Sequence, residues 1–429
     1  MATGPLDGVK VLEFSQIIAG PFAGIVLADL GADVVKVERL GGEGTRSVAG
    51  VIPGTSKQFQ FLNRGKRSLV VDLNDPKGLA LIHRIVPSFD VITINYRPSV
   101  IRRLKIDYDT LSQLRPDLIY AQISGFGSHG PRADEPLIDM VAQAYSGYMA
   151  EVGVVDEFDG PKGTHGGTID AATGLSTVIG VVSALYHRAE SGEGQFVDVA
   201  LLRSAMLLIG GSITQEPASN SAPRLTEARE GFAQGVDYAS VLQGYKGANS
   251  VDDQRVVVPH SAMRGPFLAG YMAKDGPVFI GAYTAVMRAL ARQALSIPDD
   301  GSDEPGFDPV GPNAQPIIAK TRQAVVDAVR SRTVDEVVSE LLAVGVPVAP
   351  VYLASEVGND PQASEFMVEI EDELTGPQRQ LGGIVEMSKS TVGPAGPAPV
   401  LGRHTDEILQ EVGLSADEIV ELREAGTVS

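Results

Sequence analysis

The chain has 429 residues, of which 43% are hydrophobic and 21% charged, and its formal net charge is −19. The composition is typical of a globular protein, and the length predicts two domains or one large domain with an insertion. The negative charge argues against nonspecific binding to nucleic acid or an anionic membrane, and the absence of cysteine excludes disulfides, a thiol nucleophile and Cys-based metal sites.

No targeting or membrane signal is expected. The N-terminal segment lacks the basic and apolar regions of a secretory signal. No apolar run reaches the roughly 20 residues that a membrane-spanning helix needs. The longest run, residues 175–185, is interrupted by Ser, Thr and Gly. We therefore expect a cytoplasmic protein without a membrane partner.

Strand and helix patterns alternate through the first part of the chain. Apolar, β-branched segments predict strands at residues 9–14, 33–38, 68–73, 90–95 and 118–124. Helices are predicted between them at residues 21–31, 78–85 and 108–114, the first with proline in its first turn and glycine where it ends. This alternation predicts an α/β fold with a parallel sheet covered by helices.

Further elements follow along the chain. A helix with one buried face is predicted from apolar residues at spacings of three and four, namely Leu175, Val178, Ile179, Val182, Leu185 and Tyr186. Residues 192–202 predict a turn that leads into a strand, and residues 211–262 are more polar and irregular. Near the C-terminus, helices are predicted at 334–345 and 415–426 with an apolar strand at 346–353, and the last helix opens with a capping box of Ser415 and Glu418.

Several familiar catalytic motifs are absent. Residues 19–24 (AGPFAG) follow the first strand but lack the G-x-G-x-x-G spacing of dinucleotide-binding proteins, which argues against a nicotinamide enzyme. There is no G-x-S-x-G sequence, so a hydrolase triad is unsupported. The six histidines show no metal-binding spacing, and we expect no metal site.

Basic residues cluster beside three predicted strands. Arg39 and Arg46 form one group, residues 63–68 a second and residues 95–103 a third. Arg39 and Arg97 fall where strands end, and ligands of open parallel sheets bind at the carboxyl ends of the strands. Each cation alone is consistent with an ordinary surface residue. Together they favour an edge that binds a phosphate-rich anion.

Asp170 lies in the sequence HGGTIDAATGL, among small residues and just before the predicted helix. The small neighbours would let a bulky substrate reach its carboxylate. The amide groups and dipole at the start of the helix would keep the side chain ionised, and an accessible carboxylate can act as a nucleophile. Local sequence leaves a second interpretation open, in which Asp170 only caps the helix.

A set of motifs, in order along the chain, resembles the class III CoA-transferases, the family of formyl-CoA transferase and carnitine CoA-transferase, with 2-methylacyl-CoA racemases as relatives. These motifs are GVKVLEFSQIIAGPFAGIVLADLGADVVKVER, NRGKRSLVVDL, INYRPSVIRRL, LIYAQISGFG, VAQAYSG, GEGQFVDVALL and LGRHTDEILQEVGLS. The resemblance implies a large Rossmann-like domain built from residues 1–210 and 331–429. It also implies linkers and a smaller α+β domain at 211–330, and a homodimer of two interlocked chains.

The resemblance also implies an activity and its residues. An aspartate at the position of Asp170 would attack the acyl-CoA thioester, forming first a mixed anhydride and then an enzyme–CoA thioester. Coenzyme A, the acyl-CoA and a carboxylic acid would be substrates, and no permanently bound cofactor is implied. CoA contacts carry over to Ile18, Ala19, Arg39, Val71, Asp72, Leu73, Asn74, Asn95, Tyr96, Arg97 and Arg103, and Asp139 would lie near the reacting carboxylate.

The sequence departs from the family pattern at three places. Ile138 stands where the racemases have a histidine, which weakens the racemase alternative because isoleucine cannot carry a proton. Asn74 stands where lysine is common. Residues 258–266 lack the glycine run of formyl-CoA transferase. The alternatives to a transferase are thus a 2-methylacyl-CoA epimerase and a non-catalytic CoA-binding paralogue, and the sequence does not name the two acids.

Overall fold

The computed structural model describes residues 3–50, 52–158, 160–215, 222–248, 265–304, 307 and 314–429. Residues 258–264, which include most of the segment compared above with a glycine-run loop, lie outside this description. The chain divides into two compact units, Met1–Thr214 with Phe366–Ser429, and Gln215–Glu365. Both ends of the chain therefore build the larger unit.

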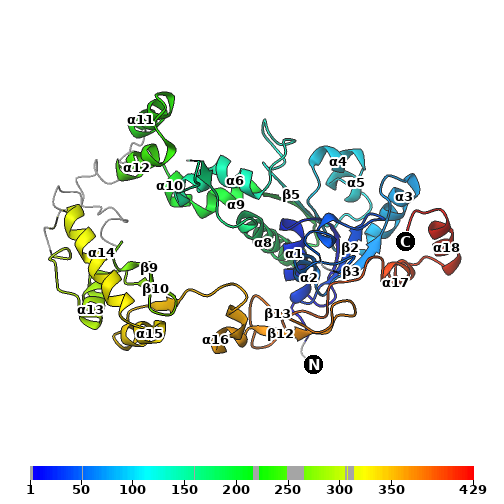
Figure 1. The fold of residues 1–429 in the computed structure, drawn as a ribbon. Helices are drawn as coiled ribbons and strands as arrows, with labels where there is room; N and C mark the ends of the chain where they lie inside the picture. The colour runs from blue at the N-terminus through cyan, green and yellow to red at the C-terminus, as the bar shows by residue number, and fades with distance from the viewer. Residues whose placement is uncertain are drawn as a thin grey trace. The chain divides into compact units, whose positions relative to one another are not determined.

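A six-stranded parallel sheet forms the centre of the larger unit, as the alternating pattern predicted (Figure 1). Its strands are β1 (Lys10–Phe14), β2 (Asp33–Glu38), β3 (Arg67–Val70), β4 (Val91–Ile94), β5 (Ile119–Ser124) and β8 (Gln195–Ala200), in the order β3-β2-β1-β4-β5-β8. Val11 of β1 pairs with Val34 on one side and Val91 on the other. This is the strand order of the doubly wound dinucleotide-binding folds, in which the chain changes direction between β1 and β4.

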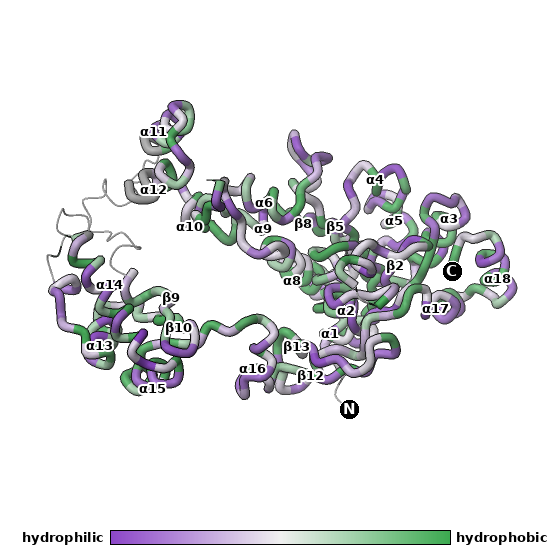
Figure 2. The backbone as a smooth tube through the Cα atoms, viewed as in Figure 1, coloured by the Kyte–Doolittle hydropathy of each residue, from purple (hydrophilic) through white to green (hydrophobic). Residues whose placement is uncertain are grey.

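Helices cover both faces of the sheet, because successive strand residues point to opposite sides. Val11 belongs to a core shared with α1 (Ala19–Asp29) and α8 (Thr168–Ser191). Leu12 and Phe14 belong to the opposite core, shared with α3 (Pro76–Ile85), α5 (Tyr108–Leu111), α17 (Thr405–Glu411) and α18 (Ala416–Glu424). Figure 2 shows hydrophobic residues along the sheet and mixed polarity along α17 and α18. The C-terminal helices thus complete a core that the N-terminal strands begin.

Helix α8 is longer than the sequence pattern predicted, at 24 residues, and its length and composition alone would suffice to cross a membrane. The expectation that no segment reaches this length was wrong, because the small and hydroxyl-bearing residues at its start continue the helix. One such helix is weak support for a membrane span, since core helices of soluble proteins have the same properties. Here α8 lies against α1, where Gly174 leaves room for the Ala19 carbonyl and the Phe22 ring.

The predicted buried face of this helix is only partly buried. Val178 lies in the core, but Leu175, Ile179, Val182 and Tyr186 are exposed. The buried side is instead completed by small residues such as Ala184 and Thr177. An apolar stripe at spacings of four, three and four residues therefore lies on the surface of α8.

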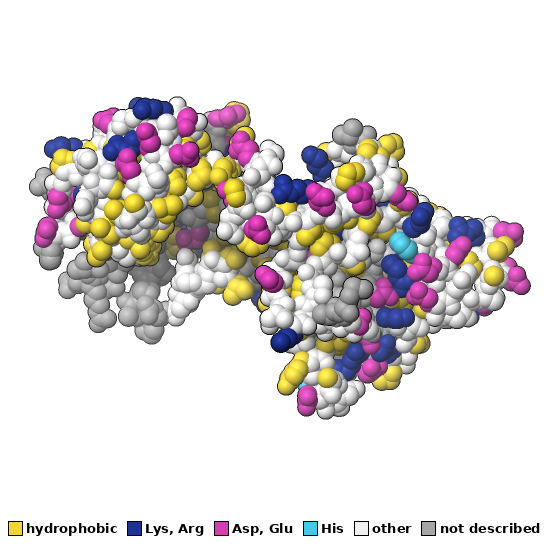
Figure 3. Space-filling view, turned by 90° about the horizontal axis from the view of Figure 1, so that it is seen from below, with side chains coloured by type: hydrophobic (Ala, Val, Ile, Leu, Met, Phe, Trp, Pro, Cys, Tyr) yellow, Lys and Arg dark blue, Asp and Glu magenta, His cyan; other side chains and the backbone are white. Residues whose placement is uncertain are grey.

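Other elements of the larger unit are short. Its remaining helices are α2 (Lys57–Asn63), α4 (Pro98–Arg103), α6 (Asp139–Ser146), α7 (Tyr148–Val152), α9 (Leu201–Leu208) and α10 (Gly210–Ile213), and its two hairpins pair β6 (Val154–Val155) with β7 (Pro161–Lys162) and β12 (Met367–Ile370) with β13 (Gln378–Leu381). Basic and acidic side chains are interspersed on the face seen in Figure 3. Arg84 of α3, for example, pairs with Glu418 of α18 at 2.7 Å.

The second unit holds a three-stranded antiparallel sheet, β11-β10-β9. Its elements are α11 (Ala222–Ala233), α12 (Tyr238–Ala248), β9 (Leu268–Met272), β10 (Pro277–Gly281), α13 (Ala285–Leu295), α14 (Ala314–Arg330), α15 (Val334–Ala343), β11 (Val348–Pro350) and α16 (Pro361–Ser364). The expectation of irregular chain from residue 211 was wrong at α11 and α12, where Ala, Leu, Glu and Arg favour helix without a clear apolar period. Residues 331–365 belong to this unit because Val337 and Leu341 share its core with Val278.

Candidate active site

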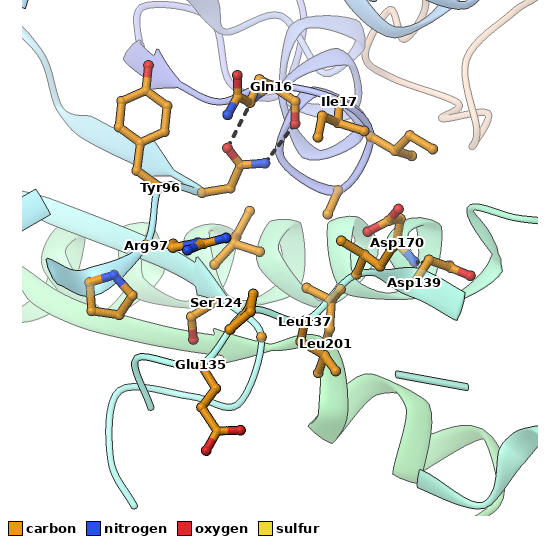
Figure 4. A pocket seen from close by; sticks show the side chains of 18 of the residues that line it. Gln16, Ile17, Tyr96, Arg97, Ser124, Glu135, Leu137, Asp139, Asp170 and Leu201 are labelled. Atoms are coloured by element: carbon orange, nitrogen blue, oxygen red, sulfur yellow. Dashed lines mark hydrogen bonds between the residues drawn. The ribbon is translucent and has the colours of Figure 1, made fainter. Parts of the chain in front are cut away.

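A cavity of about 580 Å³ opens at the carboxyl ends of β1, β4, β5 and β8 in the larger unit (Figure 4). It lies where the strand order reverses between β1 and β4, the usual ligand position in such sheets. Its lining comes from the turn after β1, the turn after β4, the end of β5, the segment before α6, the first turn of α8 and the start of α9: Gln16–Ala19, Asn95–Pro98, Val100, Ile123–Gly125, Ala133, Glu135–Asp139, Asp170 and Leu201.

The start of α8 presents Asp170 to this cavity. Gly167 occupies the N-cap position with a φ of 97°, so it has no side chain to satisfy the first amide groups of the helix. Asp139, the first residue of α6, replaces it: its Oδ2 accepts from the Ile169 amide at 2.7 Å and the Asp170 amide at 3.0 Å. Gln143 donates to the other oxygen of Asp139 at 2.6 Å. Asp139 is therefore the capping residue, and the interpretation of Asp170 as a plain helix cap is wrong.

The Asp170 carboxylate makes no hydrogen bond to the part of the chain that the structure describes. Burial raises the pKa of Asp170, and the nearby negative charge of Asp139 raises it further, to about 6. We expected the amide groups and dipole at the start of α8 to keep this side chain ionised. The amides of Ile169 and Asp170 donate to Asp139 instead, so they do not hold the pKa of Asp170 down. Asp170 is thus ionised at neutral pH, yet more basic than an ordinary aspartate.

Most of the predicted ligand contacts meet in this cavity. Ile18, Ala19, Asn95, Tyr96, Arg97, Ile138, Asp139 and Asp170 all line it. Arg97 lies at the end opposite Asp170 in Figure 4, and its guanidinium has no partner among the described residues. Ile138, which we expected at the position of the racemase histidine, is 62% exposed beside Asp139.

The other predicted contacts do not line the cavity. Arg39 follows β2 and donates from Nε to the Gly42 carbonyl at 2.7 Å. Val71 is fully buried and bridges to Val428, and Asn74 hydrogen-bonds Asp72. Leu73 packs against the core and Arg103 is exposed on α4. The structure therefore does not place Arg39, Val71–Asn74 or Arg103 in the cavity that Asp170 lines.

Several lining residues were not predicted from the sequence. Ser124 ends β5 and Leu201 follows β8, so the rule that ligands bind where parallel strands end could have found both residues. Ile17 had no such signal: it is 55% exposed and has a φ of 73°, a conformation that β-branched residues rarely adopt. Residues with strained backbone conformations cluster at functional sites. They persist only where surrounding contacts impose the conformation.

Known proteins resemble this chain along its length. The family model described as CoA-transferase family III matches residues 6–405. The succinyl-CoA:mesaconate CoA-transferase of Haloarcula hispanica is 30% identical over 96% of this chain and 97% of its own, and the human succinyl-CoA:glutarate CoA-transferase is 29% identical over 99% and 90%. The crystal structure of a CAIB/BAIF family protein from Brucella suis is 27% identical, with a TM-score of 0.72 over 96% of this chain and 100% of its own. The chain therefore belongs to CoA-transferase family III.

Proposed function

We propose that this enzyme moves CoA from an acyl-CoA donor to a carboxylic acid acceptor through covalent intermediates on Asp170. The observation that carries the proposal is a single carboxylate, free of hydrogen bonds to the described chain and raised in pKa to about 6, facing a cavity at the carboxyl edge of the sheet. A carboxylate that is more basic than usual and faces a cavity is suited to nucleophilic attack on a thioester.

Four steps exchange the groups without any net proton transfer. An oxygen of Asp170 attacks the thioester carbonyl, and the CoA thiolate leaves as the acyl–aspartyl anhydride forms. The thiolate then attacks the aspartyl carbonyl, which gives the enzyme–CoA thioester and releases the donor acid. The acceptor carboxylate attacks that thioester and again releases the thiolate as a new anhydride forms. The thiolate finally attacks the acceptor acyl carbonyl, so that acyl-CoA leaves and the Asp170 carboxylate returns.

The cavity residues suit this use. Gln16–Ala19 would contact CoA near its thiol and pantetheine part, and Arg97, at the other end of the cavity, would be a charge partner for a CoA phosphate. Arg39, Val71–Asn74 and Arg103 would contact more distant parts of the long cofactor-like substrate along the same sheet edge. The names of the relatives pair succinyl-CoA with mesaconate or glutarate, which supports small carboxylic acids as donor and acceptor. The chemistry requires only the Asp170 carboxylate, so we propose no permanent cofactor.

We further propose that the enzyme is a cytoplasmic homodimer. The apolar stripe on α8 supports a partner surface: Ile179 is 68% exposed and Tyr186 72%, and Leu207 of α9 is 73% exposed. Contiguous exposed apolar residues of this kind mark interfaces. Tyr186→Asp should shift the sedimenting species from dimer to monomer, whereas the exposed-site control Asp417→Ala should not. A wild-type monomer would refute the dimer.

The covalent mechanism can be tested by intact-protein mass spectrometry. Wild type incubated with acyl-CoA alone and quenched in acid should gain the mass of CoA less the elements of water, and Asp170→Ala should gain nothing. Asp417→Ala, which removes an exposed carboxylate of α18, is the matched control and should label as wild type does.

Other outcomes would overturn the assignment. Hydrogen exchange at the acyl α-carbon without an adduct would indicate an epimerase. CoA binding without adduct or exchange would indicate a non-catalytic paralogue. Labelled acceptor acid gives an independent check, because a single turnover with oxygen-18 in its carboxylate should leave one labelled oxygen in Asp170.

A further inference from the structure

Three charged side chains lie fully inside the larger unit, beneath the turn that follows β1. Glu13 of β1 and Lys36 of β2 have no exposed surface, and Lys66, just before β3, is 3% exposed. The Lys36 ammonium lies 3.1 Å from Glu13 Oε1, and the Lys66 ammonium lies 2.9 Å from Glu13 Oε2. One carboxylate therefore joins two buried ammonium groups. The second positive charge is balanced by the buried Glu43, whose Oε2 lies 3.2 Å from the Lys36 ammonium.

Both ammonium groups also hold the turn that lines the cavity. Lys36 Nζ donates to the Ser15 carbonyl at 2.8 Å, where the turn leaves β1. Lys66 Nζ donates to the Pro21 carbonyl at 3.0 Å, where the turn has entered α1. Between these points, Asn95 Oδ1 accepts from the Gln16 amide at 3.0 Å and Asn95 Nδ2 donates to its carbonyl at 2.8 Å. The turn is thus held at its start, at Gln16 and at its end.

These contacts surround the strained residue. Ile17, which has a positive φ, lies between the Gln16 and Pro21 attachments and faces the cavity with Gln16 and Ile18. Such a conformation costs about 1–3 kcal/mol and persists only where neighbouring contacts impose it. Gly24 leaves the room for this arrangement, since a Cβ there would lie 1.7 Å from Glu13 Oε2 and 2.7 Å from Lys66 Nζ.

We propose that Glu13, Lys36 and Lys66 are positioning residues that hold the Ser15–Pro21 turn in the conformation that binds CoA. The turn supplies backbone and side chains to the cavity, so its displacement should weaken CoA binding more than it weakens binding of the acceptor acid. The kinetic part of this inference rests on the proposed function. Its structural part, the restraint of the turn, does not.

The charges that the restraint needs are present at neutral pH, although burial lowers the pKa of Lys66 to about 8. Burial raises the pKa of Glu13, but Lys66 and Lys36 outweigh that effect and leave the pKa below its usual range. Burial lowers the pKa of Lys36, and Glu13 and Glu43 more than compensate. Fold stability alone gives little reason for such a cluster, because well-packed apolar residues commonly serve a core as well as buried ion pairs do.

The test compares Lys36→Met with Arg64→Met. Lys36→Met removes the attachment at Ser15 while Glu13 keeps Lys66 as its partner. Arg64→Met breaks another fully buried pair, Arg64 with Asp29 at 2.7 Å, which does not touch the turn. Hydrogen–deuterium exchange of a peptide covering residues 14–22 should rise in Lys36→Met and stay as in wild type in Arg64→Met. KM for acyl-CoA should rise about tenfold in Lys36→Met, with KM for the acceptor acid unchanged.

Gly24→Ala provides a second variant should Lys36→Met not fold. It keeps all three charges but displaces the Glu13 carboxylate, so it should shift exchange and KM in the same direction by less. Unchanged exchange in Lys36→Met or Gly24→Ala, or equal losses in Lys36→Met and Arg64→Met, would overturn the inference. If wild type binds CoA but forms no covalent adduct, the proposed function fails while the exchange result and CoA affinity still decide the positioning role.

Discussion

Two groups of buried charge lie at the same edge of the sheet and behave in opposite ways. At Asp139 and Asp170, two carboxylates adjoin with no cation beside them in the described part of the chain, and the pKa of Asp170 rises to about 6. At Glu13, Lys36 and Lys66, a carboxylate lies between two cations, Glu43 balances the other positive charge, and the pKa of Glu13 falls. The unbalanced pair leaves the Asp170 carboxylate facing the cavity. The balanced group holds backbone carbonyls of the turn after β1. The presence or absence of a counter-charge therefore distinguishes a carboxylate that faces the cavity from one that supports the fold.

The largest effect should come from removing the unbalanced carboxylate. Asp170→Ala should lower kcat/KM on the order of 10⁴-fold, because the nucleophile is lost. The same variant should unfold at a higher temperature at pH 7. A raised folded-state pKa means that ionised Asp170 weakens the fold as pH rises through about 6, and the variant lacks that cost. Steady-state kinetics and thermal unfolding measure both. Loss of activity together with a lower Tm would mean that Asp170 stabilises the fold, and it would contradict the contrast between the unbalanced and the balanced group.

Removing the central carboxylate of the balanced group should instead cost stability. Glu13→Ala leaves Lys36 and Lys66 buried without their shared counter-charge, so the free energy of unfolding should fall by about 3–5 kcal/mol. Urea denaturation at pH 7 measures this change. A loss as small as that expected for a surface ion pair would mean that Glu13 is not balancing the two cations.

The pH dependence of activity should distinguish the two groups further. Because Asp170 must be ionised to attack, kcat/KM should fall about tenfold per pH unit below pH 6. Asp139→Asn keeps an oxygen to accept the α8 amides but removes the negative charge, so the inflection should move to lower pH. A pH–rate profile of wild type and Asp139→Asn measures this shift. An inflection at the same pH in both proteins would exclude Asp139 as a cause of the raised pKa of Asp170.

The smallest effect should come from an exposed pair. Arg84→Ala breaks the contact with Glu418 on the surface, where solvent screens the charges, so activity and stability should both stay as in wild type. Urea denaturation and kinetics run beside Glu13→Ala provide the measurement. A clear loss of stability would show that exposure does not separate the two kinds of charge.

Sequence patterns predicted the sheet well and the site in part. β1, β2, β4 and β5 follow local apolar periodicity, and the capping box of α18 at Ser415 was visible because both partners lie three residues apart. The cap of α8 was not visible, since Asp139 and Asp170 are 31 positions apart and only the folded chain joins them. For the same reason, the apolar stripe of α8 was interpreted as core: periodicity shows that a face is apolar but not what covers it.

Helix α8 is capped by a residue of another helix, Asp139 of α6, and this has a consequence for how the substrate preference of the enzyme can evolve. Helix α6 begins at Asp139, next to the exposed Ile138, so one short segment both borders the cavity and accepts hydrogen bonds from the first amides of α8. A substitution that reshapes this segment for a different acyl group would also move the start of α8. We therefore expect substitutions in this segment that alter which acyl group fits the cavity to alter the pKa of Asp170 as well.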